Sequence, residues 1–449
     1  MATSVLPVVA LLRISERLPV YGCPGVAMSM PRIETVIELR LLNLRQAFSV
    51  RSVRCELRTK QKMVTLLKLG SLKLEAFHEK KLCEQQVFAP PMGQKVVKNV
   101  LGVDIPLIMP IPNDVALLGL FSNWNSLTIH TLHVEYTVGS RTDTEHQTYV
   151  KDFPLVIKRY DNLPIYRQFQ EPKTHRLVLG NKQIVINVTL PDALCVGPMD
   201  TFSVHVNLKA NNLHSHLRRD VRLKQLTIQL REVCTCHEAG LTPRREIKLS
   251  TTNKQFNDSD NVLNTVGLSH TFNLKFSRVN DYLSIYDTLE PPIPPLEVKD
   301  TDALALMVDN SSLARERVLD RPDDGVPLTH AFGFTTSEGK LFRISYEMNI
   351  KLKLSGAKDL EERFPLTVLA YDRASSEALL PWIMHECEVA KARFGKEVVQ
   401  AAATGSSKLL EFTAPPVVYY NNINDWLKMG YPRQAYLSDT AVLLDIPHM

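Results

Sequence analysis

Apolar and polar residues alternate with a period of two in many short segments of the chain. In segment 33–42, for example, apolar Ile37 and Leu39 alternate with polar Glu38 and Arg40, which is the pattern of a strand with one face in water. Similar segments, bounded by Pro, Gly, Asn or Asp, are found at 50–58, 100–108, 128–138, 155–159, 184–190, 201–208, 221–233, 270–276, 341–354 and 364–370. Many short strands separated by turn residues are typical of β-sandwiches, so the pattern predicts an all-β fold.

The length of the chain and one polar stretch divide these strands into two blocks. A chain of 449 residues is too long for one core, because single cores stop growing at about 250–300 residues. The proline-marked stretch 161–173 separates two strand-rich blocks of similar size, as expected of a domain boundary. We therefore predict two immunoglobulin-type β-sandwiches in tandem, 1–165 and 174–373, with a long loop at 291–329 in the second.

The C-terminal part departs from the strand pattern. Residues 376–403 contain good helix formers, with Pro381 expected in the first turn, where proline is tolerated. The apolar stripe at spacings of three and four consists of Ile383, Cys387, Ala390 and Phe394. Because an isolated helix of this length is marginal in water, we expect it to dock on the C-terminal domain or on a partner. Residues 404–449 form a tail.

Composition narrows the classes of function. Lys and Arg number 53 against 48 Asp and Glu, with no long basic run, so a nucleic-acid partner is not indicated. Seven scattered cysteines are unlike a disulfide framework and favour a reducing cytosol. No apolar run approaches the roughly 20 residues of a membrane helix, and the apolar opening at 5–12 lacks the flanks of a signal peptide. We expect a cytoplasmic protein with peripheral membrane contact only.

Several segments, in order, resemble the arrestin family, in particular the fungal arrestin-related adaptors called α-arrestins. In the first block these segments are LRISERLPVYGCPG (12–25), IETVIELRLL (33–42), AFSVRSVRCELRTKQKM (47–63), VDIPLIMPIPNDV (103–115), TLHVEYTVG (131–139) and FPLVIKRYD (153–161). In the second they are IVINVTLPDALCVGPMDTFSVHVNLKAN (184–211), VRLKQLTIQLREV (221–233) and FRISYEMNIKLKLSGAKDLEERFPLTVLAYD (342–372). The resemblance covers roughly 5–372 and implies two arrestin-like sandwiches.

This resemblance implies a protein that acts by binding, without catalysis and without a cofactor. It implies an adaptor that recognises the cytoplasmic tail of a membrane transporter or receptor and links it to a Nedd4-type ubiquitin ligase and to endocytosis. Such an adaptor is cytoplasmic and is recruited to the plasma membrane or endosomes. An endosomal coat subunit of the retromer type, which has the same fold, is the alternative. A metal-dependent enzyme is a lesser alternative.

Ligases of the Nedd4 type bind Pro-Pro-x-Tyr motifs through WW domains, which read a polyproline conformation. The chain has no such tetrapeptide. Its nearest tail-borne form consists of Pro415, Pro416 and Tyr419, with one residue too many before the tyrosine. Two Leu-Pro-x-Tyr segments, 18–21 and 163–166, are explained more simply by packing at a domain edge. Direct and indirect recruitment of the ligase both remain open.

A second candidate motif in the tail consists of Leu409, Leu410, Glu411 and Phe412, which resemble the clathrin-binding box of certain arrestins. Thr413 replaces the acidic residue that normally ends the box, and the ordinary interpretation is a short strand folding back on the sandwich. A candidate basic patch consists of Lys80, Lys81, Arg218, Arg219, Arg244 and Arg245. It would suit acidic lipid head groups or phosphorylated tails, although charge pairs on turns are commonly only solvated.

The short catalytic motifs that have a physical mechanism are missing from the sequence. The two clusters with metal-ligand chemistry are Cys234, Cys236 and His237, and His385, Glu386 and Cys387. The first has three ligands and lacks the usual spacing of a tetrahedral zinc site, and the second is contiguous on a predicted helix, so its side chains point in three directions. We interpret both clusters as ordinary structural residues.

Overall fold

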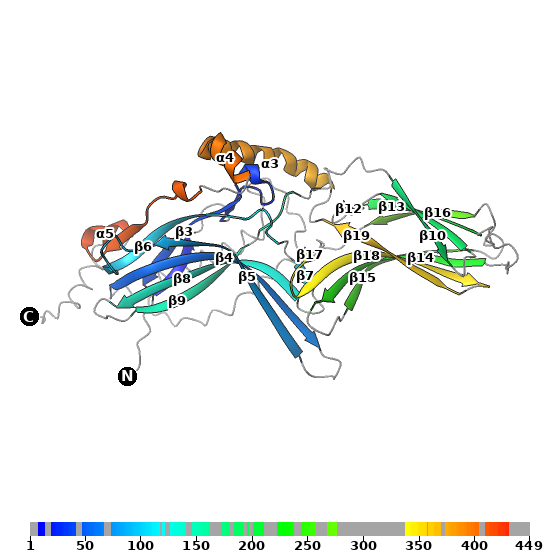
Figure 1. The fold of residues 1–449 in the computed structure, drawn as a ribbon, viewed down its shortest axis with the longest axis horizontal. Helices are drawn as coiled ribbons and strands as arrows, with labels where there is room; N and C mark the ends of the chain where they lie inside the picture. The colour runs from blue at the N-terminus through cyan, green and yellow to red at the C-terminus, as the bar shows by residue number, and fades with distance from the viewer. Residues whose placement is uncertain are drawn as a thin grey trace, which may run out of the picture.

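The computed structural model confirms an all-β protein with two β-rich regions and a C-terminal arm (Figure 1). The residues described are 8–13, 19–41, 47–66, 73–116, 119–121, 126–140, 146–155, 157–161, 163, 172–179, 184–191, 195–196, 201–210, 222–237, 244–256, 267–275, 337–356, 358–369, 373–403 and 409–430. The predicted loop at 291–329 and most of the predicted boundary at 161–173 lie outside them, so both stay predictions.

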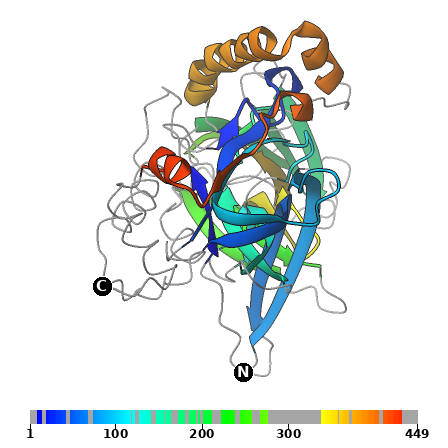
Figure 2. The same ribbon diagram turned by 90° about the vertical axis from the view of Figure 1, so that its left-hand side faces the viewer.

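One ten-stranded sheet folds around the N-terminal core. Its strands before the arm are β1 (Val8–Arg13), β2 (Val20–Tyr21), β3 (Arg32–Leu41), β4 (Phe48–Leu66), β5 (Lys73–Phe88), β6 (Val97–Pro110), β7 (Gly119–Phe121), β8 (Ser126–Ser140) and β9 (His146–Leu155). β1, β3 and β6 form one side, and β5, β4, β8 and β9 form the other (Figures 1 and 2). Alternate residues such as Val53, Cys55 and Val103 fill the space between the two sides.

The C-terminal sandwich consists of two sheets that share one core. The first contains β10 (Pro172–Leu179), β11 (Ile184–Pro191), β13 (Thr201–Ala210) and β16 (Leu268–Lys275). The second contains β12 (Cys195–Val196), β19 (Leu360–Val368), β18 (Phe342–Ser355), β14 (Arg222–Cys236), β15 (Arg244–Gln255) and β17 (Ser337–Glu338). Strict alternation produces the core: Phe202, Val204 and Val206 of β13 point inward, whereas Ser203 and His205 point outward.

Residues 373–430 form the arm. Its elements are α3 (Arg373–Phe394), α4 (Lys396–Ala403), η5 (Leu409–Phe412), β20 (Val417–Tyr420) and α5 (Ile423–Lys428). The single helix predicted at 376–403 is two helices, because Gly395 adopts a left-handed φ of 85° that ends the first one. Pro381 lies inside α3 rather than in its first turn, since the helix begins at Arg373. Its ring is on the exposed side.

The arm docks on the N-terminal sandwich, so the expected docking on the C-terminal domain is wrong. Ile383 packs against Cys23 and Tyr160, and Phe394 packs against Met30. The receiving surface surrounds the short helix η1 (Ala27–Ser29), which lies under α3 and α4 (Figure 2). The apolar stripe is otherwise as predicted, except that Cys387 is only half-buried.

Candidate functional site

One edge of β6 pairs with β3 and then with the start of β4, which leaves the other edge as a site for an added strand. β4 pairs with β6 only near Val97 and Val100, before it turns away to β5 and β8. From Val100 to Asp104 the opposite edge of β6 pairs with β20 of the arm, antiparallel, with Tyr419 opposite Gly102. Where the pairing with β20 ends, Asn99 adopts a left-handed φ of 62°, and its carbonyl accepts a 2.9 Å hydrogen bond from the Asn421 amide.

A polar cluster lies beside this added strand. The Tyr419 hydroxyl donates to Oδ2 of Asp104 at 3.0 Å, and Nη2 of Arg13 contacts the same oxygen at 2.7 Å. Arg40 donates to the other oxygen of Asp104 and contacts Glu38 at 3.1 Å. Its guanidinium carbon is 5.7 Å from the centroid of the Tyr419 ring. Two cations and two carboxylates therefore balance one another under the tail.

The charges of this cluster set its protonation states. Burial disfavours the ionised form of Asp104, but the hydrogen bonds and charges of Arg40 and Arg13 outweigh burial and lower its pKa. The pKa of Tyr419 is raised, first by burial and then by the negative charge of Asp104. At neutral pH the pair is therefore a phenol donating to a carboxylate, a charge-assisted hydrogen bond of the stronger kind.

The candidate ligase motif is part of the added strand. Pro415 and Pro416 are exposed, but Tyr419 is half-buried with its hydroxyl bonded to Asp104. A WW groove needs an extended proline helix and a free tyrosine, so this segment is available to a ligase only when β20 leaves β6. Of the Leu-Pro-x-Tyr segments, Tyr21 lies under the guanidinium of Arg32 at 5.3 Å. In the second segment only the buried Leu163 is described.

The clathrin-box-like segment folds back on the sandwich as a 3₁₀ turn, where we expected a strand in the ordinary interpretation. Leu409 is buried beside Met30, and Phe412 packs edge-on against Phe394 with ring centroids 5.0 Å apart. Glu411 is exposed, Leu410 is 55% exposed and Phe412 is 38% exposed, so only Leu409 of the motif is buried. The clathrin interaction itself stays a prediction.

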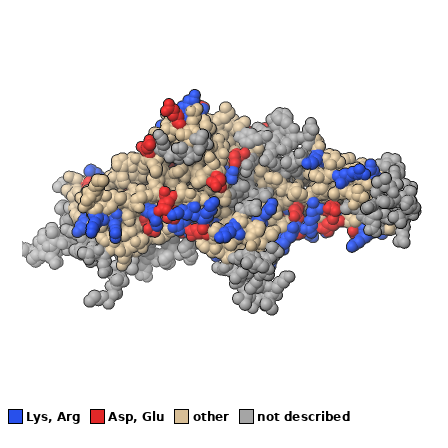
Figure 3. Space-filling view, viewed as in Figure 1, with Lys and Arg blue, Asp and Glu red and all other residues tan. Residues whose placement is uncertain are grey.

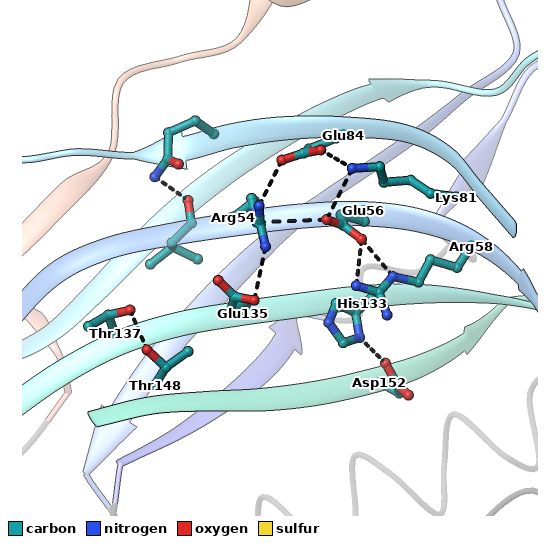
Figure 4. A network of polar contacts seen from close by, with 12 residues as sticks. Arg54, Glu56, Arg58, Lys81, Glu84, His133, Glu135, Thr137, Thr148 and Asp152 are labelled. Atoms are coloured by element: carbon teal, nitrogen blue, oxygen red, sulfur yellow. Dashed lines mark hydrogen bonds and ion pairs between the residues drawn. The ribbon is translucent and has the colours of Figure 1, made fainter. Parts of the chain in front are cut away.

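A second polar surface covers the outer face of β5, β4, β8 and β9 (Figure 4). Arg54 bonds to Glu84 and Glu135, both at 3.0 Å, and the buried carboxylate of Glu56 accepts from Arg58 at 2.6 Å. Between Arg54 and Lys62 the register places five cations and five carboxylates on this face: Arg54, Arg58, Lys60, Lys62 and Lys81, and Glu56, Glu79, Glu84, Glu135 and Asp152. This face is therefore neutralised within itself.

The members of the candidate basic patch lie on two different sandwiches. Lys80 and Lys81 are on β5, and Arg244 and Arg245 are on β15, while Arg218 and Arg219 lie outside the described residues. Lys81 contacts Glu56 at 3.7 Å, and Arg244 contacts Glu347 at 2.6 Å. These two cations already have carboxylate partners.

The two clusters with metal-ligand chemistry do not converge. Cys234 and Cys236 are buried in the C-terminal core, whereas His237 is exposed at the end of β14. On α3, Glu386 is buried, His385 is exposed and Cys387 is half-buried. Within the described part of the chain, no three His, Cys, Asp or Glu side chains are arranged to hold a metal ion.

Among the described helices, none is long and apolar enough to cross a membrane. No protein-family model matches the chain. The chain is similar to the protein named RHO1 GEF localizing protein 1 of Saccharomyces cerevisiae, with 21% identity over 485 residues and 93% of each chain covered. The similarity therefore extends over both sandwiches and the arm of this chain, at a low level of identity.

Proposed function

We propose that this chain is a non-enzymatic, arrestin-like adaptor that binds extended segments of partner proteins at a sheet edge. The observation that supports this function is β20, an extended segment already held on β6 by backbone pairing and by the bond from Tyr419 to Asp104. Strand addition provides affinity through main-chain hydrogen bonds and selectivity through alternate side chains. Such an adaptor acts in the cytoplasm, with peripheral recruitment to membranes.

The relative's name suggests the class of partner. That relative is named as a protein that localises an exchange factor for the GTPase Rho1, and the similarity covers 93% of each chain. We extend this role to the present chain, whose partner would be a guanine-nucleotide exchange factor of a Rho-type GTPase. The chain would position the factor and leave nucleotide exchange to it.

A complementation experiment tests this role. The chain is expressed in Saccharomyces cerevisiae cells that lack the relative, and a fluorescent Rho1 exchange factor is imaged. We expect the factor to regain the position that it has in wild-type cells. An unchanged, mislocalised factor in cells that contain normal amounts of the folded chain would contradict the proposal. The Tyr419→Phe variant is then imaged beside the unmodified chain, because this change removes only the bond from the tail strand to Asp104.

The second candidate function is the one implied by the arrestin resemblance, in which the adaptor links transporters or receptors to ubiquitination. The exposed Pro415 and Pro416, close to Tyr419, favour it. Ubiquitination of a transporter that depends on the chain, with no effect on an exchange factor, would distinguish this function from the first. A stable stoichiometric assembly in a pull-down would instead favour an endosomal coat subunit.

A further inference from the structure

The outer face of the six-stranded sheet in the C-terminal sandwich carries an excess of positive charge. By register, seven cations and three carboxylates point outward on β14 between Gln225 and Thr235 and at the neighbouring positions of β15, β18 and β19, and Glu338 of β17 lies opposite Arg343. The cations are Arg231, Arg244, Lys248, Arg343, Lys351, Lys353 and Arg363, and the carboxylates are Glu246, Glu347 and Glu361. We call these ten residues the basic face. Figure 3 shows Lys and Arg gathered over β14, β15 and β18, with Asp and Glu between them.

The carboxylates of the basic face are each shared between cations. Glu246 contacts Arg231, Arg244 and Arg363, and these arginines outweigh burial and lower its pKa. Glu347 contacts Arg244 at 2.6 Å and Arg363 at 3.6 Å.

Three cations of the basic face have no carboxylate partner among the described residues: Lys248, Arg343 and Lys353. Between Arg54 and Lys62, the outer face of the N-terminal sandwich holds five cations and five carboxylates and so has no such excess. The basic face is therefore the surface that would attract an anionic ligand.

The floor of the basic face favours a polypeptide ligand. Asn349 and Arg231 point outward but are only 0% and 7% exposed. Nε of Arg231 and Oδ1 of Asn349 are buried without a hydrogen-bond partner, which is uncommon in folded proteins. One is a donor and the other an acceptor. A peptide backbone offers both complements, C=O and N–H, whereas a phosphate dianion offers only acceptors.

The chain itself contains an acidic segment between two strands of the C-terminal sandwich. Residues 276–336 hold eleven Asp and Glu against five Lys and Arg, a net charge of −6. Since the whole chain carries +5, the rest of it carries +11. The segment lies between β16 and β17, and β17 pairs directly with β18, where Glu338 is opposite Arg343 of the basic face.

We propose that the acidic segment 276–336 docks on the basic face and occupies it. The opposite charges, the covalent attachment beside Arg343 and the unpaired donor and acceptor in the floor all favour this occupant. Covalent attachment also gives the segment a high effective concentration, so that weak contacts suffice. An external acidic ligand would have to displace it, and the docking would weaken as salt is raised.

Zero-length cross-linking of the full-length monomer with a carbodiimide tests the docking directly. We expect Lys248 and Lys353 to link to Asp and Glu residues of 276–336 within one molecule, at a yield that falls in high salt. Lys80 and Lys98 are exposed lysines on the N-terminal sandwich and serve as the matched controls. Links from the segment to Lys80 and Lys98 in equal yield would overturn the proposal.

A binding experiment in trans uses charge variants that keep the length of the chain. In the neutralised chain, Asp300, Asp302, Asp320, Asp323 and Asp324 are changed to Asn, and the probe is a peptide of residues 297–324. We expect the peptide to bind the neutralised chain about tenfold more tightly than it binds the unmodified chain. The triple change K248E, R343E and K353E should abolish that gain.

Two further outcomes would overturn the proposal. The first is equal peptide binding by the neutralised and unmodified chains, since the segment would then not occupy the face. The second is equally tight binding of phosphatidylserine vesicles by both chains through Lys248 and Lys353, since the face would then be open to a membrane. The change of Lys80, Lys98 and Lys151 to Glu reverses the same amount of charge on the other sandwich and should leave peptide binding intact.

Discussion

Tyr419 donates a 3.0 Å hydrogen bond to Oδ2 of Asp104, although 315 positions separate the two residues. The bond joins the tail to the middle of an N-terminal strand. Asp104 is also held by Arg13 and Arg40, so its carboxylate remains paired when the tail is absent. Release of the tail therefore leaves no buried charge without a partner, and the docked and released states can be close in free energy.

Tyr419→Phe should loosen the tail without unfolding the sandwich. Removal of one hydrogen bond costs about 1 kcal/mol, which corresponds to roughly fivefold faster exchange of the amides of 417–420 through local opening. Hydrogen exchange with mass spectrometry measures this change. Tyr420→Phe is the matched control, because Tyr420 is 45% exposed. Equal effects of the two changes would show that the bond to Asp104 contributes nothing to docking.

Deletion of Val418 should convert the tail into a better WW ligand. It creates Pro415-Pro416-Val417-Tyr, whereas the natural spacing misplaces the ring by one residue rise, about 3 Å. We expect an isolated tail peptide with the deletion to bind a WW array more tightly than the natural peptide. In the full chain, natural Tyr419 should bind more weakly still, because it is paired with Asp104. The register argument fails if both peptides bind equally.

Phe394→Asp should detach α3 and α4 from the N-terminal sandwich. Phe394 is 4% exposed and packs with Met30 and Ile108, so the change removes an aromatic contact worth about 3–5 kcal/mol and adds a charge. Limited proteolysis between α3 and η5 reports the release. Met384→Asp, at a position 64% exposed on the same helix, should have no such effect. Unchanged protease resistance of the Phe394 variant would count against docking.

Gly339→Ala should weaken the contact between the two sandwiches. A methyl group there would lie 1.6 Å from Nε2 of Gln61, so the Gln61 side chain would have to leave the Lys340 amide, which now donates to it at 2.9 Å. We expect a loss of about 1–3 kcal/mol in urea unfolding. In a Gln61→Ala background the same change should cost much less. Additive effects would show that the two residues are not coupled.

Stability should fall as the pH is lowered from 6.5 towards 4 because of one buried imidazole. Burial lowers the pKa of His130 from 6.5 to about 4, and its Nε2 donates to the Ala116 carbonyl at 2.9 Å. In this window the unfolded chain binds a proton that the folded chain does not, which costs up to about 3 kcal/mol. Urea unfolding at pH 7 and pH 5 measures the effect. His130→Gln should have a shallower pH dependence, and an unchanged slope would exclude His130 as the cause.

Alternation identified the strands that have one face in the core, including β3, β13 and β18. It missed β5, β10, β15 and nearly all of β9, and it placed a strand at 155–159 where β9 ends at Leu155. β5 and β15 are rich in Lys, Arg and Glu, because their outward side chains pair with charges on neighbouring strands. Those neighbours are far away in the sequence, so a local pattern does not reveal them. Their stability as strands comes from cross-strand pairs.

The candidate site was only partly predictable. The tail was expected to fold back, but Asp104 was not singled out, although it is the lone charge in the apolar stretch 100–110, and Arg40 was taken only as a polar position on a wet face. A charge in such a strand indicates a buried partner, and this signal was available. The identity of the partner could not be read from the sequence, because Tyr419 reaches Asp104 only through the register of β20 on β6. That register depends on the path of the whole arm.

The pairing of β20 with β6 also has a consequence for solubility. An unpaired strand edge is a template for pairing with another chain, and β6 between Val100 and Asp104 would be such an edge without the tail. A chain truncated before Val417 would present these backbone groups on a strand whose side chains are apolar at Val100, Leu101 and Val103. Two truncated molecules could then join edge to edge. β20 thus shields the molecule from its own copies, and fragments that lack it should self-associate as their concentration rises.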